Sequence, residues 1–218
     1  MKISVSFLKS KFSLTETLKK IDESTADFIH VDLMDGVFVE EKTENSSEIL
    51  SELKKVTKPL DVHLMMEKDA LEKTIKEIYK LNPYRLAIPS ELDSTEKYLE
   101  DIKAHNILCG IAINPDTNIK DIKKFFDKID FVLVMSVYPG KGGQTFLENT
   151  TTKLQEIIRE RDNKKLQFTI AVDGGIKKDT IKQVKPYCDT VISGSFVCMS
   201  DDYDKQIALL KEEPNKTL

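Results

Sequence analysis

Short apolar stretches alternate with longer charged stretches along the whole chain. The apolar stretches are rich in Val, Ile and Leu, which is typical of strands buried on both faces of a sheet; they cover residues 2–7, 28–33, 60–64, 84–88, 108–113, 131–137, 168–173 and 190–193. Between them, apolar residues recur at helical spacing in residues 14–24, 48–56, 70–81, 94–105, 119–126, 149–161, 180–185 and 204–210. Ser94 and Asp179 precede two of these segments and suit the N-cap position of a helix.

This strict alternation predicts a (β/α)8 TIM barrel. Each β-α unit takes about 25 to 30 residues, as expected for parallel strands joined by helices. A doubly wound sheet is the alternative, but it usually has fewer units, and no G-x-G-x-x-G motif follows the first strand. No linker divides the chain, so we expect a single barrel domain over residues 1–218, with a frayed tail at residues 211–218.

Composition describes an ordinary globular protein, with 40% hydrophobic and 32% charged residues and a net charge of -4. This charge predicts no binding to nucleic acid. No apolar run is long enough for a membrane helix, and the first residues do not form a signal peptide, so we expect no membrane association and a cytoplasmic location. Cys109, Cys188 and Cys198 have no C-x-x-C spacing, which argues against a disulfide framework.

Two of the three histidines stand beside aspartates near the ends of predicted strands. His30 and Asp32 close the second strand, His63 the third and Asp173 the seventh. Strand residues i and i+2 point the same way, and barrel enzymes carry their chemistry at the C-terminal strand ends. The four side chains should therefore converge. Two imidazoles and two carboxylates would form a divalent-metal site that also contains acid/base groups.

Each of these residues also has a simpler interpretation. A lone buried histidine is more often satisfied by the backbone, and Asp173 could be a turn residue before Gly174 and Gly175. Two histidines near carboxylates at one barrel mouth favour the metal site, because carboxylates among Val and Ile are costly to bury unpaired. Asp35 is interpreted as a turn residue. Asp61 lies on the same face as the third-strand histidine but deeper, and no role is predicted for it.

Glycine-rich turns follow the sixth, seventh and eighth predicted strands. Their backbone N–H groups could cradle an anion, and the loops after strands seven and eight are the usual phosphate site of such barrels. For any single loop, a turn without a ligand is an equal alternative; three adjacent loops favour a phosphate site, with Lys141 as an added charge. The candidate residues are Gly142, Gly143, Gly174, Gly175, Gly194 and Ser195.

Three methionines also stand near predicted strand ends, namely Met34, Met65 and Met135. Core packing is the more common use of methionine. The functional alternative is an apolar lining around a reactive enolate.

Taken together, these motifs resemble the ribulose-phosphate 3-epimerase family. The matching segments are His-Val-Asp-Leu-Met-Asp-Gly-x-Phe-Val at 30–39, Asp-Val-His-Leu-Met at 61–65, Met-Ser-Val-x-Pro-Gly-x-Gly-Gly-Gln-x-Phe at 135–146, Val-Asp-Gly-Gly-Ile at 172–176 and Gly-Ser at 194–195. Ser6-Phe-Leu8 resembles the family's first-strand motif, and Ala-Ile-Asn-Pro-x-Thr at 112–117 its fifth-strand motif. The resemblance covers nearly the whole chain.

The resemblance implies a metal-dependent epimerase that interconverts D-ribulose 5-phosphate and D-xylulose 5-phosphate in the pentose phosphate pathway. It implies one divalent metal ion, commonly zinc, iron, manganese or cobalt, held by His30, Asp32, His63 and Asp173, with the two aspartates as the acid/base pair. It also implies a homo-oligomer. The implied substrate contacts are Ser6, Met34, Met65 and Met135 at the reacting carbons and Gly142, Gly143, Gly174, Gly175, Gly194 and Ser195 at the phosphate.

Elementary chemistry agrees with this assignment. Inversion of a carbon beside a carbonyl needs one group to remove a proton from one face and another to deliver a proton to the opposite face. Asp32 and Asp173, from strands on opposite sides of the mouth, could do this, and a metal would stabilise the ene-diolate between the two steps.

Five positions depart from the family pattern. Glu40 and Glu41 replace Pro-Asn, Tyr138 replaces Asn or Asp, Lys141 replaces an aromatic residue, and Pro89 stands where a histidine is usual. The metal set is unchanged, but loops over the substrate are altered, which leaves another ketose phosphate, such as a hexulose 6-phosphate, open as the substrate.

Two alternatives belong to other classes. A barrel that binds sugar phosphates without catalysis would explain the missing histidine, but it does not explain the intact metal set. A Schiff-base aldolase needs a desolvated lysine inside the mouth, and no predicted strand ends in a lysine.

Overall fold

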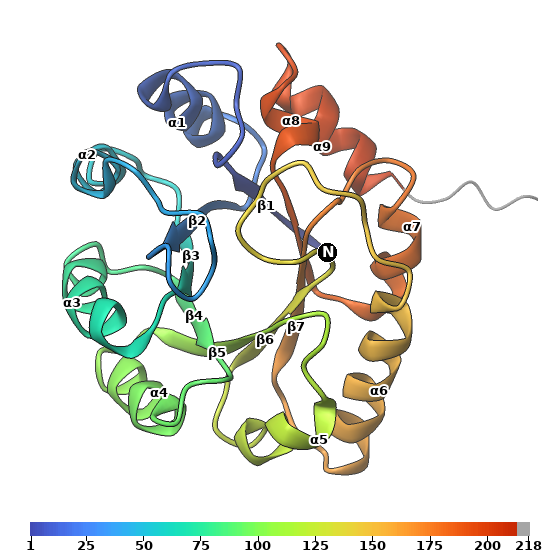
Figure 1. The fold of residues 1–218 in the computed structure, drawn as a ribbon. Helices are drawn as coiled ribbons and strands as arrows, with labels where there is room; N and C mark the ends of the chain where they lie inside the picture. Colours follow the sequence, from blue (N-terminus) through green and yellow to red (C-terminus); the bar gives the residue numbers. More distant parts are fainter. Residues whose placement is uncertain (213–218) are drawn as a thin grey trace, which may run out of the picture.

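Eight parallel strands close into a barrel in chain order, and β1 pairs with β8 (Figure 1). The strands are β1 (Lys2–Ser6), β2 (Phe28–Met34), β3 (Leu60–Met65), β4 (Arg85–Pro89), β5 (Leu108–Ile113), β6 (Phe131–Met135), β7 (Thr169–Asp173) and β8 (Thr190–Ser193). These bounds come from a computed structural model, which describes residues 1–212. The predicted (β/α)8 barrel is confirmed, and the doubly wound alternative is wrong.

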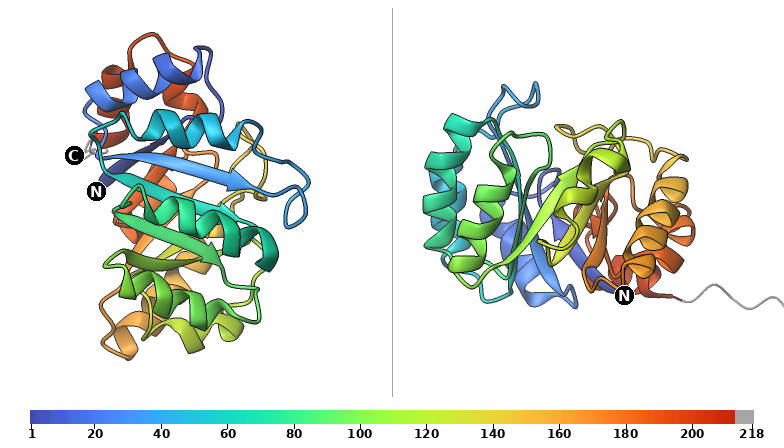
Figure 2. Two further views of the ribbon diagram at one scale, coloured as in Figure 1. Left: turned by 90° about the vertical axis from the view of Figure 1, so that its left-hand side faces the viewer. Right: turned by 90° about the horizontal axis from the view of Figure 1, so that it is seen from below.

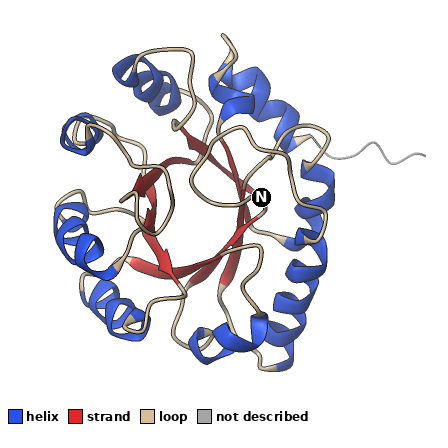
Figure 3. Cartoon of the chain, in the orientation of Figure 1, coloured by secondary structure: helices blue, strands red, loops and turns tan. Residues whose placement is uncertain are grey.

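Helices surround the barrel as an outer ring (Figure 3). They are α1 (Leu14–Glu23), α2 (Ser46–Leu53), α3 (Lys68–Tyr79), α4 (Thr95–Ala104), α5 (Ile119–Ile122), α6 (Thr150–Asn163), α7 (Ile181–Val184), α8 (Ser195–Cys198) and α9 (Tyr203–Lys211). The helices α5 and α7 are shorter than predicted and continue as single 3-10 turns, Lys123–Phe125 and Lys185–Tyr187. The last unit contains α8 as well as α9. Gly194-Ser195 after the eighth strand predicts the short helix α8, and helical spacing predicts only α9, because four residues are too few to display helical periodicity.

The strands are apolar along their length because both of their faces are buried. Outward side chains pack against the helices in one large cluster. A second cluster fills the barrel interior on one side and consists of Ala87, Ala112, Phe131, Leu133, Met135, Val137, Ala171 and Ile192. Gly110 on β5 makes room for the ring of Phe131, because a Cβ at this position would lie 2.5 Å from a ring carbon.

The loops that follow the strands gather at one end of the barrel. Figure 2 shows the β2–α2 and β6–α6 loops together at this end and the N-terminus at the other. The strand β6 ends at Met135, two residues earlier than predicted, because Ser136 turns toward β7 and its hydroxyl donates to the carbonyl oxygens of Asp173 and Gly174 at 2.8 and 2.6 Å. The barrel mouth thus lies beneath the two loops that carry most of the departures from the family pattern.

Three further expectations concern the cysteines, membrane helices and the C-terminal tail. The three cysteines are free thiols, as expected. Within residues 1–212, no helix is long and apolar enough to cross a membrane. Lys211 is the last residue of α9, so the predicted tail begins inside a helix, and residues 213–218 lie outside the described part of the chain.

Candidate active site

Four side chains converge at the carboxyl ends of β2, β3 and β7. One ligand atom from each of His30, Asp32, His63 and Asp173 lies within 4.8 Å of the others. The register between β2 and β3 places Asp32 directly beside His63, and Asp173 is the last residue of β7. The structure therefore brings together the whole predicted group.

Asp32 stands at the centre of this group. Its Oδ1 lies 3.2 Å from Nε2 of His30 and 3.4 Å from Nδ1 of His63. Its other oxygen, Oδ2, accepts a hydrogen bond of 2.8 Å from the hydroxyl of Ser6 at the end of β1. Asp173 approaches from the far side, with its Oδ2 3.9 Å from the same Nε2 of His30. All of these side chains are buried or nearly so.

Three atoms of the group are buried without a hydrogen-bond partner: Nε2 of His30, Oδ1 of Asp32 and Nδ1 of His63. Buried polar atoms are normally satisfied, so three such atoms facing one point call for a ligand. Two imidazole nitrogens and two carboxylate oxygens suit zinc and several other divalent cations. The residues present therefore fit a divalent metal ion.

Asp61 and Arg85 support this group from below, and sequence reasoning gave them no role. Oδ2 of Asp61 lies 3.0 Å from Nδ1 of His30, the ring nitrogen that faces away from the convergent atoms. Arg85 donates two hydrogen bonds to Asp61, at 2.7 and 2.8 Å. A carboxylate behind a metal-ligating histidine fixes the ring orientation and the tautomer. The sequence does show that each of these residues is unusual in a buried strand: Asp61 lies two residues before His63, and Arg85 is the charged residue of β4.

The two carboxylates of the group have different electrostatic environments, and their pKa values shift in opposite directions. Burial raises the pKa of Asp173 to about 7, and the charge of Asp32 adds to this effect. Burial acts in the same direction on Asp32, but the charge of His30, together with hydrogen bonding to His30 and His63 and the charge of His63, outweighs burial and holds the pKa of Asp32 well below its usual range. Burial alone would lower the pKa of His30; the charges of Asp32 and Asp61 outweigh it and raise the pKa of His30 above its ordinary value.

A pocket opens above the four convergent residues. Asp32, Asp173, Ser6, Met65 and Met135 line it. Met34 lies in the adjoining pocket and packs against Val39 and Met65. The predicted apolar lining therefore lies around the carboxylates, with two methionines in the same pocket and the third next to it.

The three glycine turns form another wall of this pocket. They contribute Gly142, Gly143, Gly174, Gly175, Gly194 and Ser195. Gly175 has a φ of +63°, and a Cβ there would lie 2.7 Å from the backbone nitrogen of Phe146, so glycine lets the β7–α7 loop approach the β6–α6 loop. All six candidate phosphate residues thus face one cavity.

Two of the altered family positions, Tyr138 and Lys141, line this pocket, and Glu41 lies in two adjoining pockets. Lys141 and Glu41 pair across the mouth at 3.6 Å, and the Tyr138 hydroxyl donates to Asp116 at 3.2 Å. Glu40 joins these residues in a further pocket. Pro89 ends β4, and its carbonyl accepts a hydrogen bond of 2.9 Å from Thr95.

A Schiff-base lysine is not found among the strand ends that the structure describes. Burial lowers the pKa of Lys153, as such a lysine requires. However, its ammonium group donates to the carbonyl oxygens of Asn114, Pro115 and Thr117 at 2.7 to 2.9 Å. Lys153 therefore holds the β5–α5 loop and is not available at the mouth.

Several solved structures share this fold. Tryptophan synthase from Mycobacterium tuberculosis superposes with a TM-score of 0.67 at 15% identity, covering 96% of this chain and 89% of that one. A 3-hexulose-6-phosphate synthase superposes with a TM-score of 0.65 at 17% identity, covering 97% of this chain and 98% of that one. The fold and the convergent group at its mouth define a protein of the (β/α)8-barrel class with a candidate active site.

Sequence comparison identifies the family. Residues 2–198 match the model of the ribulose-phosphate 3 epimerase family. The ribulose-phosphate 3-epimerase of Bacillus subtilis is 33% identical over 97% of this chain and 98% of its own length. That of Helicobacter pylori is 34% identical over 93% of both chains, and a chloroplastic ribulose-5-phosphate-3-epimerase of Arabidopsis thaliana is 32% identical over 96% of this chain and 75% of its own. The chain belongs to the ribulose-phosphate 3-epimerase family and is an epimerase, an enzyme of the carbohydrate isomerase class.

Proposed function

We propose that this enzyme is a metal-dependent 3-epimerase that interconverts D-ribulose 5-phosphate and D-xylulose 5-phosphate. The names of its relatives support the substrate. The observation that carries the proposal is the approach of two carboxylates, the buried Asp32 from β2 and the partly buried Asp173 from β7, to one point at the barrel mouth.

These two carboxylates suit the chemistry of inversion. The hydrogen at C3 is acidic because C3 is bonded to the C2 carbonyl carbon. One carboxylate removes this proton and leaves an ene-diolate, and the protonated form of the other delivers a proton to the opposite face of C3. The two groups then hold exchanged protonation states, so the reverse reaction uses them in the opposite order.

His30, Asp32, His63 and Asp173 would hold the divalent cation, through atoms that include the unpartnered Nε2, Oδ1 and Nδ1. When bound, the cation supplies a Lewis acid that favours negative charge on the substrate oxygens at C2 and C3. Ser6 fixes one oxygen of Asp32 through its hydroxyl, so the other oxygen stays directed at the two histidines.

The other predicted contacts suit the remaining parts of the substrate. Met65 and Met135 exclude water from the reacting carbons, and Met34 extends this apolar lining. The backbone N–H groups of the three glycine turns provide dipoles for the phosphate.

The test is epimerisation of ribulose 5-phosphate, coupled to detection of xylulose 5-phosphate, before and after chelation and after return of zinc, iron, manganese or cobalt in turn. We expect turnover that chelation abolishes and at least one of these metals restores. Turnover in deuterium oxide should also place deuterium at C3. Full turnover after verified removal of the metal would contradict metal dependence, and metal-loaded protein without turnover would contradict the proposed substrate.

A second candidate substrate is a hexulose 6-phosphate, and one observation favours it. Glu40, Glu41, Tyr138 and Lys141, which depart from the family pattern, line the pocket beside the catalytic pocket, where a longer sugar would extend. The ratio of kcat/KM for the six-carbon and five-carbon ketose phosphates decides between them.

Three expectations stay predictions: a homo-oligomer, a cytoplasmic location and no binding to nucleic acid. Sedimentation of the purified protein, cell fractionation and a gel-shift assay test them.

A further inference from the structure

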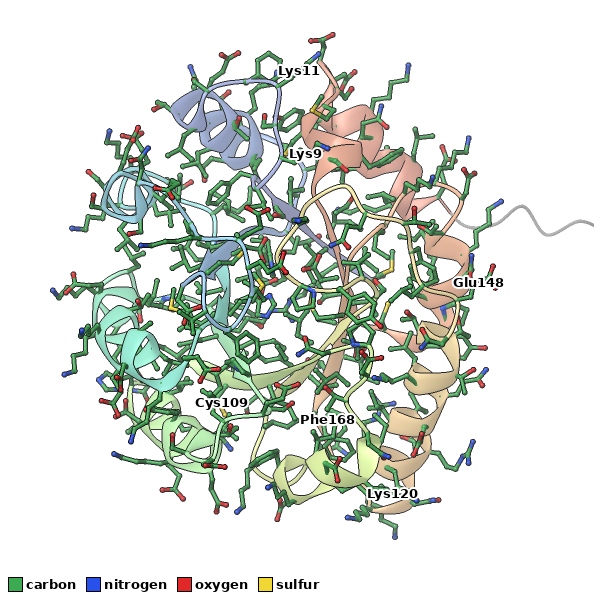
Figure 4. The ribbon with its side chains drawn as sticks, in the orientation of Figure 1. Lys9, Lys11, Cys109, Lys120, Glu148 and Phe168 are labelled. Atoms are coloured by element: carbon green, nitrogen blue, oxygen red, sulfur yellow. The ribbon has the colours of Figure 1, made fainter. Side chains whose placement is uncertain are left out.

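Lys9 follows β1 and lies across the glycine turn of the β6–α6 loop. A Cβ on Gly142 would lie 3.2 Å from the Cβ of Lys9, and a Cβ on Gly143 would lie 3.0 Å from its Nζ. The lysine side chain therefore runs along these two glycines and ends at the second. Figure 4 labels Lys9 where the β1–α1 loop meets the β6–α6 loop.

Lys9 lines the same pocket as the candidate metal ligands and the three glycine turns. The pocket has one other lysine, Lys141, and this one pairs with Glu41 at 3.6 Å. In the described range 1–212, no carboxylate oxygen lies within 4.0 Å of the Lys9 ammonium group. Lys9 is thus the cation of this pocket that has no carboxylate partner.

The negative charge of a phosphate ligand in this pocket favours such a group. Asp32 and Asp173 contribute carboxylates, and Glu41 stands at the rim. A phosphate group adds about −1.5 to −2 charges at neutral pH. Backbone N–H groups offer dipoles without net charge, so a cation beside them would offset repulsion that the glycine turns alone leave in place.

We propose that Lys9 binds the phosphate of the substrate with its ammonium group, at the side of the pocket formed by Gly142 and Gly143. This inference rests on the proposed function for the identity of the substrate, but the ligand it needs is any phosphate monoester or free phosphate. Lys9 is not one of the four convergent side chains, so its removal should weaken substrate binding and leave the chemical step unchanged.

The test compares Lys9→Met with Lys9→Arg in the metal-loaded protein. Lys11→Met is the matched control, because it removes an equal charge from the same loop, and Lys11 pairs with Asp201 at 2.6 Å and does not line the pocket. Two measurements are made on each variant: the Kd of inorganic phosphate by calorimetry, and kcat and KM for ribulose 5-phosphate. Inhibition by D-ribulose, which lacks the phosphate, serves as a third.

A hydrogen bond to a charged group contributes about 1.5–3 kcal/mol, and at this exposed position we take the lower end, which corresponds to about a tenfold change. Lys9→Met should therefore raise both the phosphate Kd and the KM about tenfold, with kcat and inhibition by D-ribulose unchanged. Lys9→Arg should retain most of the affinity, and Lys11→Met should match the unmodified protein.

Unchanged phosphate affinity in Lys9→Met would overturn the assignment, and so would an equal loss in Lys11→Met, which would indicate a general effect of charge. If ribulose 5-phosphate is not turned over while phosphate binding still depends on Lys9, the proposed substrate fails and the role of Lys9 stands.

Discussion

Replacement of Asp61 by asparagine tests how the barrel interior supports the catalytic group. Asp61 accepts two hydrogen bonds from the guanidinium of Arg85, at 2.7 and 2.8 Å, and its Oδ2 lies 3.0 Å from Nδ1 of His30. Asparagine keeps the shape of the side chain and removes its charge. Both Arg85 and His30 then lose their carboxylate partner.

The first expected effect is on stability. The side chain of Arg85 is only 4% exposed, so it cannot turn to solvent for a new partner. Removing one member of a buried ion pair costs about 3–5 kcal/mol. The rings of Phe28 and Phe131 lie 5.3 and 4.6 Å from the guanidinium carbon and retain part of the stabilisation of the cation. We therefore expect a loss near the lower end, about 3 kcal/mol, measured by urea unfolding of the metal-free protein.

The second expected effect is on the metal. Asp61 faces the ring nitrogen of His30 that points away from the convergent atoms, so it fixes which nitrogen faces Asp32. Loss of such an outer carboxylate typically lowers metal affinity about 10- to 100-fold. Competition with a chromophoric chelator measures this affinity directly.

Arg85→Met is the matched control, because it breaks the same ion pair and leaves the contact between Asp61 and His30. It should lower the stability as well, while metal affinity changes by less than about threefold, since the outer carboxylate is retained. If Asp61→Asn bound metal as tightly as the unmodified protein, Asp61 would not orient His30. If its unfolding midpoint were also unchanged, the buried ion pair would not stabilise the barrel.

Three further predictions follow from the same structure. Asp32→Asn and Asp173→Asn should each lower kcat by about 10²- to 10⁴-fold, because each removes one proton-transfer group; near-normal turnover in either would contradict the two-carboxylate mechanism. Metal returned to the chelated protein at 100 times its Kd should stabilise the fold by about 2.7 kcal/mol, seen as a higher Tm, and a Tm indifferent to metal would mean that the site does not bind it. Gly110→Ala should destabilise the protein by about 1–3 kcal/mol in urea unfolding, because its Cβ would meet the Phe131 ring at 2.5 Å. It should leave KM unchanged, because neither residue lines the catalytic pocket. Unchanged stability would show that the ring moves aside at no cost.

The sequence predicted the fold well because the strands of a closed parallel barrel are buried on both faces. This burial makes each strand a continuous apolar run, which is easily separated from the amphipathic helices. Helical periodicity does not identify α8, which has four residues and is predicted only by the Gly194-Ser195 turn. The pattern failed at the lengths of α5 and α7, where lysines such as Lys123 and Lys185 continue the chain in 3-10 turns.

The four convergent residues could be predicted because their placement depends on strand parity and on the rule that chemistry lies at strand ends. The pair of Asp61 and Arg85 depends on something else, the register between β3 and β4, which places these two residues directly opposite each other. Register between strands is set by the closure of the whole barrel. The position of Lys9 likewise depends on how two loops meet above the mouth, and no local pattern contains this information.

The barrel interior explains why two chemically identical carboxylates differ. Its β1–β4 side is polar and carries a connected series of charged and polar groups from Arg85 through Asp61 and His30 to Asp32. Its β5–β8 side is filled by the apolar cluster that includes Ala171, which lies two residues before Asp173 and shares its face of β7. Asp32 therefore has cationic neighbours, while Asp173 reaches the same point from the apolar side, where burial raises its pKa to about 7. A divided interior thus gives the mouth one carboxylate that is held ionised and one that readily holds a proton, which is the pair that inversion at C3 needs.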